Sequence, residues 1–314
     1  MKVSSLRKVP RAVRFLMSMY NSSMLNKFAA GIDYLAIGHI TRDLSPEDET
    51  TASWGGTSAY AALTAQRLGM RSGILTAFDP EEDLGPLAGI PIAGISSESS
   101  TTFTNRMTTE GRKQRVSHQA APIHPYMLPE IWRTCSVVHF GPVLDEIDLA
   151  LLRLFPEALV GATPQGWLRE VHADGSVSRT DWAEAAYVLD HVNAAVLSEQ
   201  DVEKDEDQIR AFAEVCRVLV VTAGAAGCRV FVDGFATEIP TVPAIEIDST
   251  GAGDIFAAAF FTHLFRNDEP LDAARFAVRI ATGSIGRRGL DGVPTEAEFY
   301  EAASQQPSQT RDIS

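Results

Sequence analysis

The sequence predicts an α/β fold in which helices cover both faces of a mostly parallel sheet. Short apolar runs of strand length alternate along the chain with longer segments of helical periodicity. This alternation is typical of parallel sheets, because the chain must cross over between strands that point the same way, usually through a helix. With 314 residues, 45% of them hydrophobic, the chain can bury one large core or two modest ones.

The predicted strands are short apolar runs, as expected for strands that are buried on both faces. In chain order they are Tyr34–Ile40, Ser72–Phe78, Cys135–Phe140, Ala158–Ala162, Ala194–Leu197 and Val218–Val221, followed by a hairpin of Cys228–Val232 and Thr237–Ile239 around an Asp-Gly pair. The predicted helices are Thr57–Leu68 (stopped by Gly69), a segment near Asp148–Phe155, Trp182–Leu189, Gln208–Cys216, Ala252–Phe265 and Leu271–Ile285.

Two polar stretches break this alternation and are predicted to project from the sheet as a small lid. Residues 101–119 contain two polar β-runs, Thr101–Met107 and Arg112–Gln119, separated by the hairpin signal TTEG. Residues 41–54 form the second stretch.

Composition divides the chain into three segments. Residues 1–30 hold six basic residues and no acidic one. A transit peptide has this composition, but a basic N-terminal extension is the favoured interpretation. Residues 31–300 are predicted to form one folded domain, and residues 301–314 a C-terminal tail.

The composition also excludes several classes of partner. A formal charge of −14 argues against non-specific nucleic-acid binding. No apolar run approaches the length of a membrane span, so no membrane association is expected. Cys135, Cys216 and Cys228 lie in or beside apolar runs without close pairing, which indicates reduced, buried thiols in a cytoplasmic protein.

The segment IDSTGAGDIFAAAF, from Ile247 to Phe260, predicts an anion site. A helix that starts near Ala252 leaves its first backbone N–H groups unpaired, and Gly251 and Gly253 let a ligand approach that backbone closely. Asp254 then lies beside the anion. A carboxylate in that position can accept a proton from a hydroxyl that attacks phosphorus.

Together with four other segments, DSTGAGD resembles the signatures of the ribokinase-like (PfkB) carbohydrate kinase family. IGHITRDL resembles the first strand of that family, and GGTSAYAALTAQRLG its double-glycine motif and helix. VVTAGAAGCRVF resembles the strand and turn on the nucleotide side, and IGRRGLDGVPT the closing segment. The segments follow the family order from about residue 32 to residue 296.

The resemblance implies a ribokinase-like three-layer αβα sandwich with a small β-lid, and a kinase that transfers the γ-phosphate of ATP, with Mg²⁺, to a sugar or polyol hydroxyl. It implies that Asp254 is the general base and that the Gly251, Ala252, Gly253 and Asp254 amides form the anion hole. The acceptor is expected against Asp43, Gly55, Gly56, Tyr60 and Arg106. The nucleotide is expected near Thr222, Gly224, Gly227 and Ser198, with Asp201 near Mg²⁺ and Asp248 near a monovalent cation such as K⁺.

The chain departs from the family pattern at three places. Tyr60 stands where many members have asparagine, and Ser198-x-x-Asp201 replaces an Asn-x-x-Glu motif. The segment FDPEEDLGPLAG is shorter than its family counterpart. These departures alter the acceptor pocket, so the acceptor of the best-known members cannot be carried over.

Alternatives remain open at this point. A nucleoside kinase of the same fold could use Tyr60 and Phe103 against a base, and a non-catalytic sugar or nucleotide sensor is a second alternative, which Asp254 disfavours. The basic cluster of the lid, which includes Arg106, is either a solvated edge or a group that reaches the substrates. A homodimer through the lid is compatible with the sequence. Trp167, in GATPQGWLRE, is interpreted as a core residue, although that segment could line the site.

P-loop kinases and dinucleotide oxidoreductases are excluded by pattern. No Gly-x-x-x-x-Gly-Lys-Ser/Thr segment occurs in the chain. Gly38 is followed by HITRDL, and a dinucleotide fold needs Gly-x-Gly-x-x-Gly after its first strand.

Overall fold

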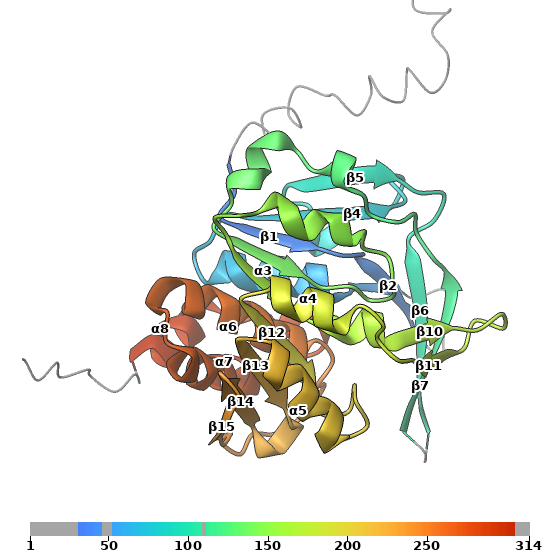
Figure 1. Ribbon diagram of the computed structural model, residues 1–314. Helices are drawn as coiled ribbons and strands as arrows, with labels where there is room; N and C mark the ends of the chain where they lie inside the picture. The colour runs from blue at the N-terminus through green and yellow to red at the C-terminus, as the bar shows by residue number, and fades with distance from the viewer. Residues whose placement is uncertain (1–30, 46–51, 109–110, 305–314) are drawn as a thin grey trace, which may run out of the picture.

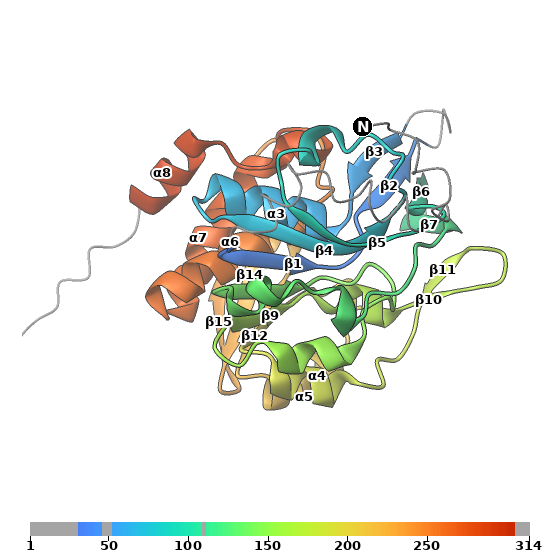
Figure 2. The same cartoon turned by 90° about the horizontal axis from the view of Figure 1, so that it is seen from above.

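The computed structural model describes residues 31–45, 52–108 and 111–304, and these residues form three layers. A large sheet lies between two helical layers, as Figures 1 and 2 show from two sides. The predicted basic extension, the centre of the 41–54 stretch and the end of the C-terminal tail lie outside the described residues.

The central sheet has nine strands in the order β15-β14-β13-β12-β9-β8-β1-β4-β5. In chain order these are β1 (Tyr34–Ile37), β4 (Ser72–Phe78), β5 (Ile92–Ser96), β8 (Val137–Phe140), β9 (Leu159–Ala162), β12 (Ala194–Ser198), β13 (Val218–Thr222), β14 (Cys228–Val232) and β15 (Phe235–Ile239). Neighbours from β5 to β13 pair in parallel, and the β14–β15 hairpin continues the sheet in antiparallel pairing. The mostly parallel sheet predicted from the sequence is therefore confirmed.

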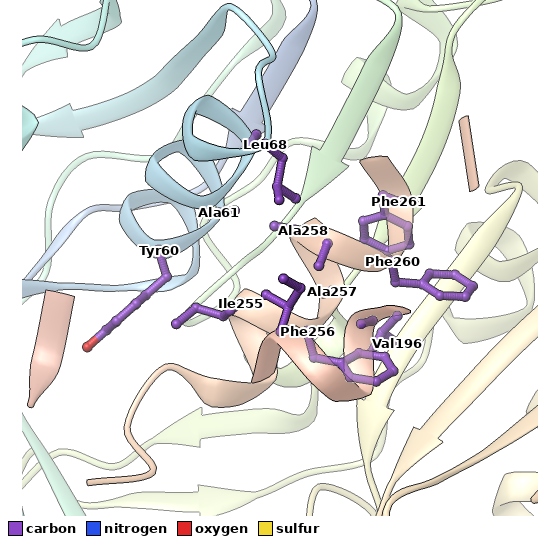
Figure 3. Close-up of a cluster of buried hydrophobic side chains, with 14 of the residues drawn as sticks. Tyr60, Ala61, Leu68, Val196, Ile255, Phe256, Ala257, Ala258, Phe260 and Phe261 are labelled. Atoms are coloured by element: carbon purple, nitrogen blue, oxygen red, sulfur yellow. The ribbon is translucent and has the colours of Figure 1, made fainter. Parts of the chain in front are cut away.

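Helices cover both faces of this sheet, and each face has its own apolar core. On one face lie α3 (Thr57–Arg67), α6 (Ala252–Asn267), α7 (Pro270–Ser284) and α8 (Glu296–Ser304). On the other lie α4 (Ala185–His191), α5 (Glu206–Val215) and the short 3₁₀ helices η4 (Glu130–Thr134) and η5 (Leu149–Leu154). Figure 3 shows the first core, where alanines of α3 and α6 allow these two helices to pack closely.

A second sheet of four strands forms the lid, in the order β3-β2-β6-β7. Its strands are β2 (Thr41–Leu44), β3 (Ala52–Gly55), β6 (Thr101–Thr108) and β7 (Gly111–His118). A small hairpin of β10 (Arg169–Val171) and β11 (Val177–Arg179) meets the outer edge of β7, where the Val116 amide donates to the Gly175 carbonyl over 2.8 Å. Both lid segments predicted from the sequence supply strands to this sheet.

The structure refines three local expectations. The helix predicted near Asp148–Phe155 is present as the short 3₁₀ helix η5, with Asp148 accepting from the Ala150 amide at its start. Helix α4 begins at Ala185 rather than at the predicted Trp182. The Trp182 side chain lies before the helix, where it is stacked on Trp167 in the core. Helix α8 continues beyond the predicted end of the domain at residue 300.

Other features of the core agree with the sequence. Trp167 is 5% exposed, as expected for a core residue. All three cysteines are buried and free, and burial raises the pKa of Cys135 and Cys228 to about 12. Within the described ranges, no helix combines the length and apolarity needed to cross a bilayer.

Candidate active site

A cleft with a cavity volume of about 70 Å³ lies where the lid faces one end of the central sheet. Residues of the lid, of the first turns of α3 and α6, and of two loops line it together: Thr41, Asp43, Gly56, Thr57, Tyr60, Phe103, Gln114, Val143, Gln165, Arg169, Thr250, Gly251 and Asp254. Five residues predicted from three separate motifs therefore meet in one place: Asp43, Gly56, Tyr60, Gly251 and Asp254. The loops that follow parallel strands are where ligands bind in open α/β sheets.

Helix α6 begins at this cleft, as the glycine-rich segment predicted. Gly251 is the N-cap in the left-handed conformation (φ 79°), and Asp254 lies in the first turn. The Ala252 amide donates to the Ser249 carbonyl over 3.1 Å, so it is already engaged in a turn. Helix geometry gives the amide of Gly253 no acceptor within the helix, and a Cβ built at this position meets no atom within 4 Å. The backbone around Gly253 is thus open to an anion.

Tyr60 lies against the loop that precedes α6. A Cβ on Gly251 would overlap the Tyr60 ring, and Tyr60 is 2% exposed. In Figure 3 its side chain points away from the apolar cluster, with the hydroxyl at the far end. Tyr60 therefore supports the turn that contains Gly251, in addition to lining the cleft.

Asp254 makes a contact that the sequence did not reveal. The Thr57 hydroxyl, at the start of α3, donates to Oδ1 of Asp254 over 2.7 Å. Burial raises the pKa of the nearby Tyr34 hydroxyl well above its ordinary value, and the negative charge of Asp254 raises it further. The carboxylate is thus oriented by a neutral donor, and the phenol close to it stays protonated.

Asp43, the residue predicted to bind the acceptor, lines the cleft from the lid strand β2. A Cβ on Gly55 would overlap the Asp43 carboxylate, so the bare backbone of β3 makes room for this side chain. Gly56 (φ 85°) lines the cleft directly at the N-cap of α3. Arg106 is exposed on β6 and is not among the cleft-lining residues.

Gln114, Gln165 and Arg169 line the cleft and were missed as site residues. Gln114 is on the lid strand β7, whereas Gln165 and Arg169 belong to the segment GATPQGWLRE that follows β9. The position of this segment after a buried strand was the available signal. It supplies both a core residue, Trp167, and two polar residues of the cleft.

A buried carboxylate shapes the loop after β8, which contributes Val143 to the cleft. Glu146 is 2% exposed and accepts from the amides of His39, Val143 and Leu144 at 2.8–3.0 Å. Three amide donors thus satisfy the oxygens of this buried side chain. The loop is thereby tied to the residues that follow β1.

The predicted nucleotide side lies at the ends of β12 and β13, where Ser198 pairs with Thr222. Gly224 (φ 54°) has open space where a Cβ would be, as a ligand-facing position would require. At Gly227 (φ 97°) a Cβ would overlap the Ile239 carbonyl, so this glycine permits close packing against the end of β15. Of the two glycines, Gly224 is therefore the better candidate for a donor contact.

Asp201 is suited to a hydrated cation. One of its oxygens accepts from the Ser198 amide over 2.8 Å, and the other accepts from the Gln165 amide group over 3.0 Å. The described residues contain no cluster of three or more metal-ligating side chains. Mg²⁺ commonly keeps its waters and takes one or two carboxylates plus substrate phosphates, so a single anchored carboxylate is compatible with it.

Asp248 connects two loops at the start of α6. Its oxygens accept from the amides of Thr250 over 2.9 Å and of Gly289 over 3.0 Å. Burial raises the pKa of Asp248, but the hydrogen bonds from Gly289 and Thr250, together with the positive charge of Arg288, outweigh this effect, and the pKa lies below its ordinary value of 3.8. The placement of a monovalent cation at this turn stays a prediction.

The lowered pKa of Asp248 predicts a pH-dependent loss of stability in Asp248→Asn. The ionised carboxylate stabilises the folded state above pH 3.8, and this contribution is lost as the pH falls through the lower folded-state pKa. We therefore expect Asp248→Asn to lower the melting temperature at pH 7 and to differ less from the unmodified protein as the pH falls below 4. Thermal unfolding across this range measures it; an equal difference at every pH would contradict the prediction.

Comparisons with known proteins identify the family. The model of the pfkB family carbohydrate kinases matches residues 189–297. A probable fructokinase-5 of Arabidopsis thaliana is 32% identical over 248 residues, which are 69% of this chain and 75% of that protein. This chain belongs to the pfkB family of carbohydrate kinases.

Other pfkB relatives cover the chain less evenly. An inositol 3-kinase of Zea mays is 28% identical over 206 residues, which are 65% of this chain and 53% of that protein. An inositol 3-kinase of Oryza sativa subsp. japonica is 29% identical over 49% of its length. The chain thus spans about half the length of the inositol 3-kinases that it matches.

Solved structures confirm the ribokinase fold. A pyrophosphate-dependent kinase of the ribokinase family, complexed with a pyrophosphate analogue and myo-inositol, superposes with a TM-score of 0.72 at 22% identity, covering 86% of this chain and 99% of that one. Ribokinase of Arabidopsis thaliana, complexed with ribose and ATP, superposes with a TM-score of 0.67 at 15% identity, covering 88% and 100%. The three-layer architecture with a β-lid predicted from the sequence is therefore confirmed.

Proposed function

We propose that this pfkB protein transfers a phosphoryl group to a hydroxyl of a small sugar or polyol. The observation that carries the proposal is the position of Asp254. It lies in the first turn of α6, next to the open backbone of Gly253, and faces the same cleft as Asp43. A carboxylate beside a bound phosphate is electrostatically unfavourable, unless it accepts the proton of the hydroxyl that attacks the phosphorus.

Each residue then has a defined task. Asp43, Gly56 and Gln114 bind and orient the acceptor, because a carboxylate and an amide can each take part in more than one hydroxyl hydrogen bond. Asp254 accepts the proton of the hydroxyl that attacks. The backbone at Gly251–Asp254 stabilises the charge on the transferred group, with the amide of Gly253 as its clearest donor.

ATP is the proposed donor and Mg²⁺ the proposed ion, with Asp201 reaching the ion through water. When bound, Mg²⁺ neutralises charge on the donor phosphates. Thr222, Gly224 and Ser198 are the candidate contacts on the donor side. Since one kinase with this fold is pyrophosphate-dependent, pyrophosphate is the donor to test beside ATP.

Cyclic polyols and hexoses are the acceptors to test first. Relatives of this chain are named inositol 3-kinase and fructokinase, and the polar lining of the cleft suits molecules with several hydroxyls. The nucleoside alternative is less well supported, because the Tyr60 ring lies against Gly251.

A matrix of donors and acceptors tests the proposal. Purified full-length protein is incubated with ATP or pyrophosphate and with myo-inositol, fructose, ribose or adenosine, and phosphorylated product is detected by mass spectrometry. We expect product with a polyol or hexose. Product with adenosine alone would favour a nucleoside kinase, and no product from any pair, with binding retained, would favour a sensor.

The lid should exclude water when both substrates are bound. Phe103 and Gln114, on two lid strands, line the cleft, so the acceptor would contact the lid directly. Closure favours transfer to the acceptor over hydrolysis of the donor. We expect hydrogen exchange across residues 101–119 to slow when the acceptor and a non-hydrolysable ATP analogue are both present.

A dimer through the lid would give a different pattern. Protection of residues 101–119 from hydrogen exchange would then depend on protein concentration and would not change when the acceptor is added. The contact between Val116 and Gly175 already occupies part of the outer edge of β7 within the chain, so a dimer would have to use another part of the lid. Protection of this second kind would contradict the lid assignment.

A further inference from the structure

The contact between Thr57 and Asp254 joins the first turns of two helices. Thr57 is the first residue of α3 and is 4% exposed, and its hydroxyl donates to Oδ1 of Asp254 over 2.7 Å. Asp254 is in the first turn of α6. Both helices therefore present their N-termini, and the partial positive charge at each, to this carboxyl group.

The Thr57 side chain has little freedom to rotate away from this contact. Its methyl group lies against the bare backbone of Gly141, where an added Cβ would overlap it. A Cβ on Gly38 would in turn overlap the Gly141 carbonyl, so the end of β1 packs directly on this backbone. A β-branched side chain whose methyl group is seated in this way keeps a single χ1 rotamer.

We infer that Thr57 is a positioning residue for Asp254, and that the bare backbone of Gly141 holds the Thr57 methyl group in place. The hydroxyl fixes Oδ1, and thereby sets the direction in which Oδ2 is presented to the hydroxyl of an acceptor. This inference rests on the proposed function, in which Asp254 is the base. It assigns Thr57 a role in turnover rather than in acceptor affinity.

Two substitutions of Thr57 separate the hydroxyl from the methyl group. Thr57→Val keeps the shape and removes the donor, whereas Thr57→Ser keeps the donor and removes the methyl group. Thr64→Val is the matched control, because Thr64 is buried in the same helix and its hydroxyl has no hydrogen-bond partner among the described residues. Kinetics with the best donor and acceptor pair, and melting temperatures, are measured for each.

The expected result is a split between kcat and KM. Thr57→Val should lower kcat about tenfold to a hundredfold, because misplacement of a reacting group by about 1 Å costs that much, and both KM values should stay within about threefold. Thr57→Ser should retain most of the turnover, and Thr64→Val should match the unmodified protein.

Gly141→Ala tests whether the space at Gly141 holds the Thr57 methyl group, without changing the hydrogen-bonding groups. It replaces Thr57→Val as the test if that variant does not fold. The added methyl group would displace the methyl group of Thr57, so kcat should fall. In the Thr57→Ser background the same substitution should lower kcat by a smaller factor, because the methyl group that it would displace is absent. An equal fall in kcat in both backgrounds would overturn the role of Gly141.

Three outcomes would overturn the role of Thr57. They are unchanged kcat in Thr57→Val, a raised acceptor KM with unchanged kcat, and equal losses in Thr57→Ser and Thr57→Val. Failure of the proposed function is distinguishable, because it would show as an inactive unmodified protein or as an active Asp254→Asn variant.

Discussion

Replacing Asp254 by Asn should abolish phosphoryl transfer while leaving the fold intact. Asparagine has nearly the same shape, and its Oδ1 can still accept from the Thr57 hydroxyl, 2.7 Å from the carboxylate oxygen in the protein. It cannot take a proton from the acceptor. Loss of a general base costs on the order of 10²–10⁴ in rate, so the measured kcat should fall by that factor.

The neighbouring carboxylate Asp248 provides the control. It belongs to the same loop, but it accepts from the amides of Thr250 and Gly289 and does not line the cleft. Asp248→Asn leaves the proposed base in place, so it should lower kcat much less than Asp254→Asn. Asp254→Asn with turnover within tenfold of the unmodified protein, and with its melting temperature retained, would remove Asp254 from the mechanism.

The layers of the fold were predictable because their signals are local. Strand β4 has the predicted bounds, Ser72–Phe78, since an apolar run buried on both faces needs no partner to be recognised. Strand β5 was missed because Gly94 and Ser96 leave only Ile92, Ala93 and Ile95 as its apolar residues, so no continuous apolar run marks it. Hairpin β10–β11 was missed because each strand has only three residues, of which one is apolar. Its pairing depends on the adjacent lid rather than on its own pattern.

The site was predictable only where a motif imposes a backbone requirement. The start of α6 was found because glycine is costly in a helix, so two glycines directly before an acid indicate that a ligand needs the bare backbone. Thr57 was not found, since it lies 197 positions from Asp254 and nothing local marks the contact. Gln165 and Arg169 were missed for the same reason: their direction depends on how the segment after β9 turns toward the lid.

Tyr60 shows how the structure changes the meaning of a sequence difference. As a departure from the family asparagine it predicted an altered acceptor pocket. The structure places its ring against Gly251, so this aromatic side chain also fixes the turn that begins α6. The proposed acceptor pocket and the proposed anion site therefore share one residue.

That contact leads to opposite expectations for two glycines in one loop. Gly251→Ala should destabilise the protein, because alanine is disfavoured at φ 79° and its Cβ would overlap the Tyr60 ring. Gly253 has no positive φ and no atom within 4 Å of a built Cβ, so Gly253→Ala should keep or raise the melting temperature by replacing a glycine within a helix.

Activity should not follow stability in this pair. If the donor phosphate binds against the backbone of Gly253, the methyl group of Gly253→Ala occupies part of that space, and the KM for the donor should rise in a protein at least as stable as the unmodified one. Gly253→Val, with a larger side chain, should raise it further. Donor KM values and melting temperatures of the three variants measure this.

Unchanged donor binding in folded Gly253→Val would show that no anion binds at this helix end. A Gly251→Ala variant as stable as the unmodified protein would show that Tyr60 does not constrain the turn. Each result tests a different half of the site, because the open side of the loop is the proposed donor side and the closed side faces Tyr60.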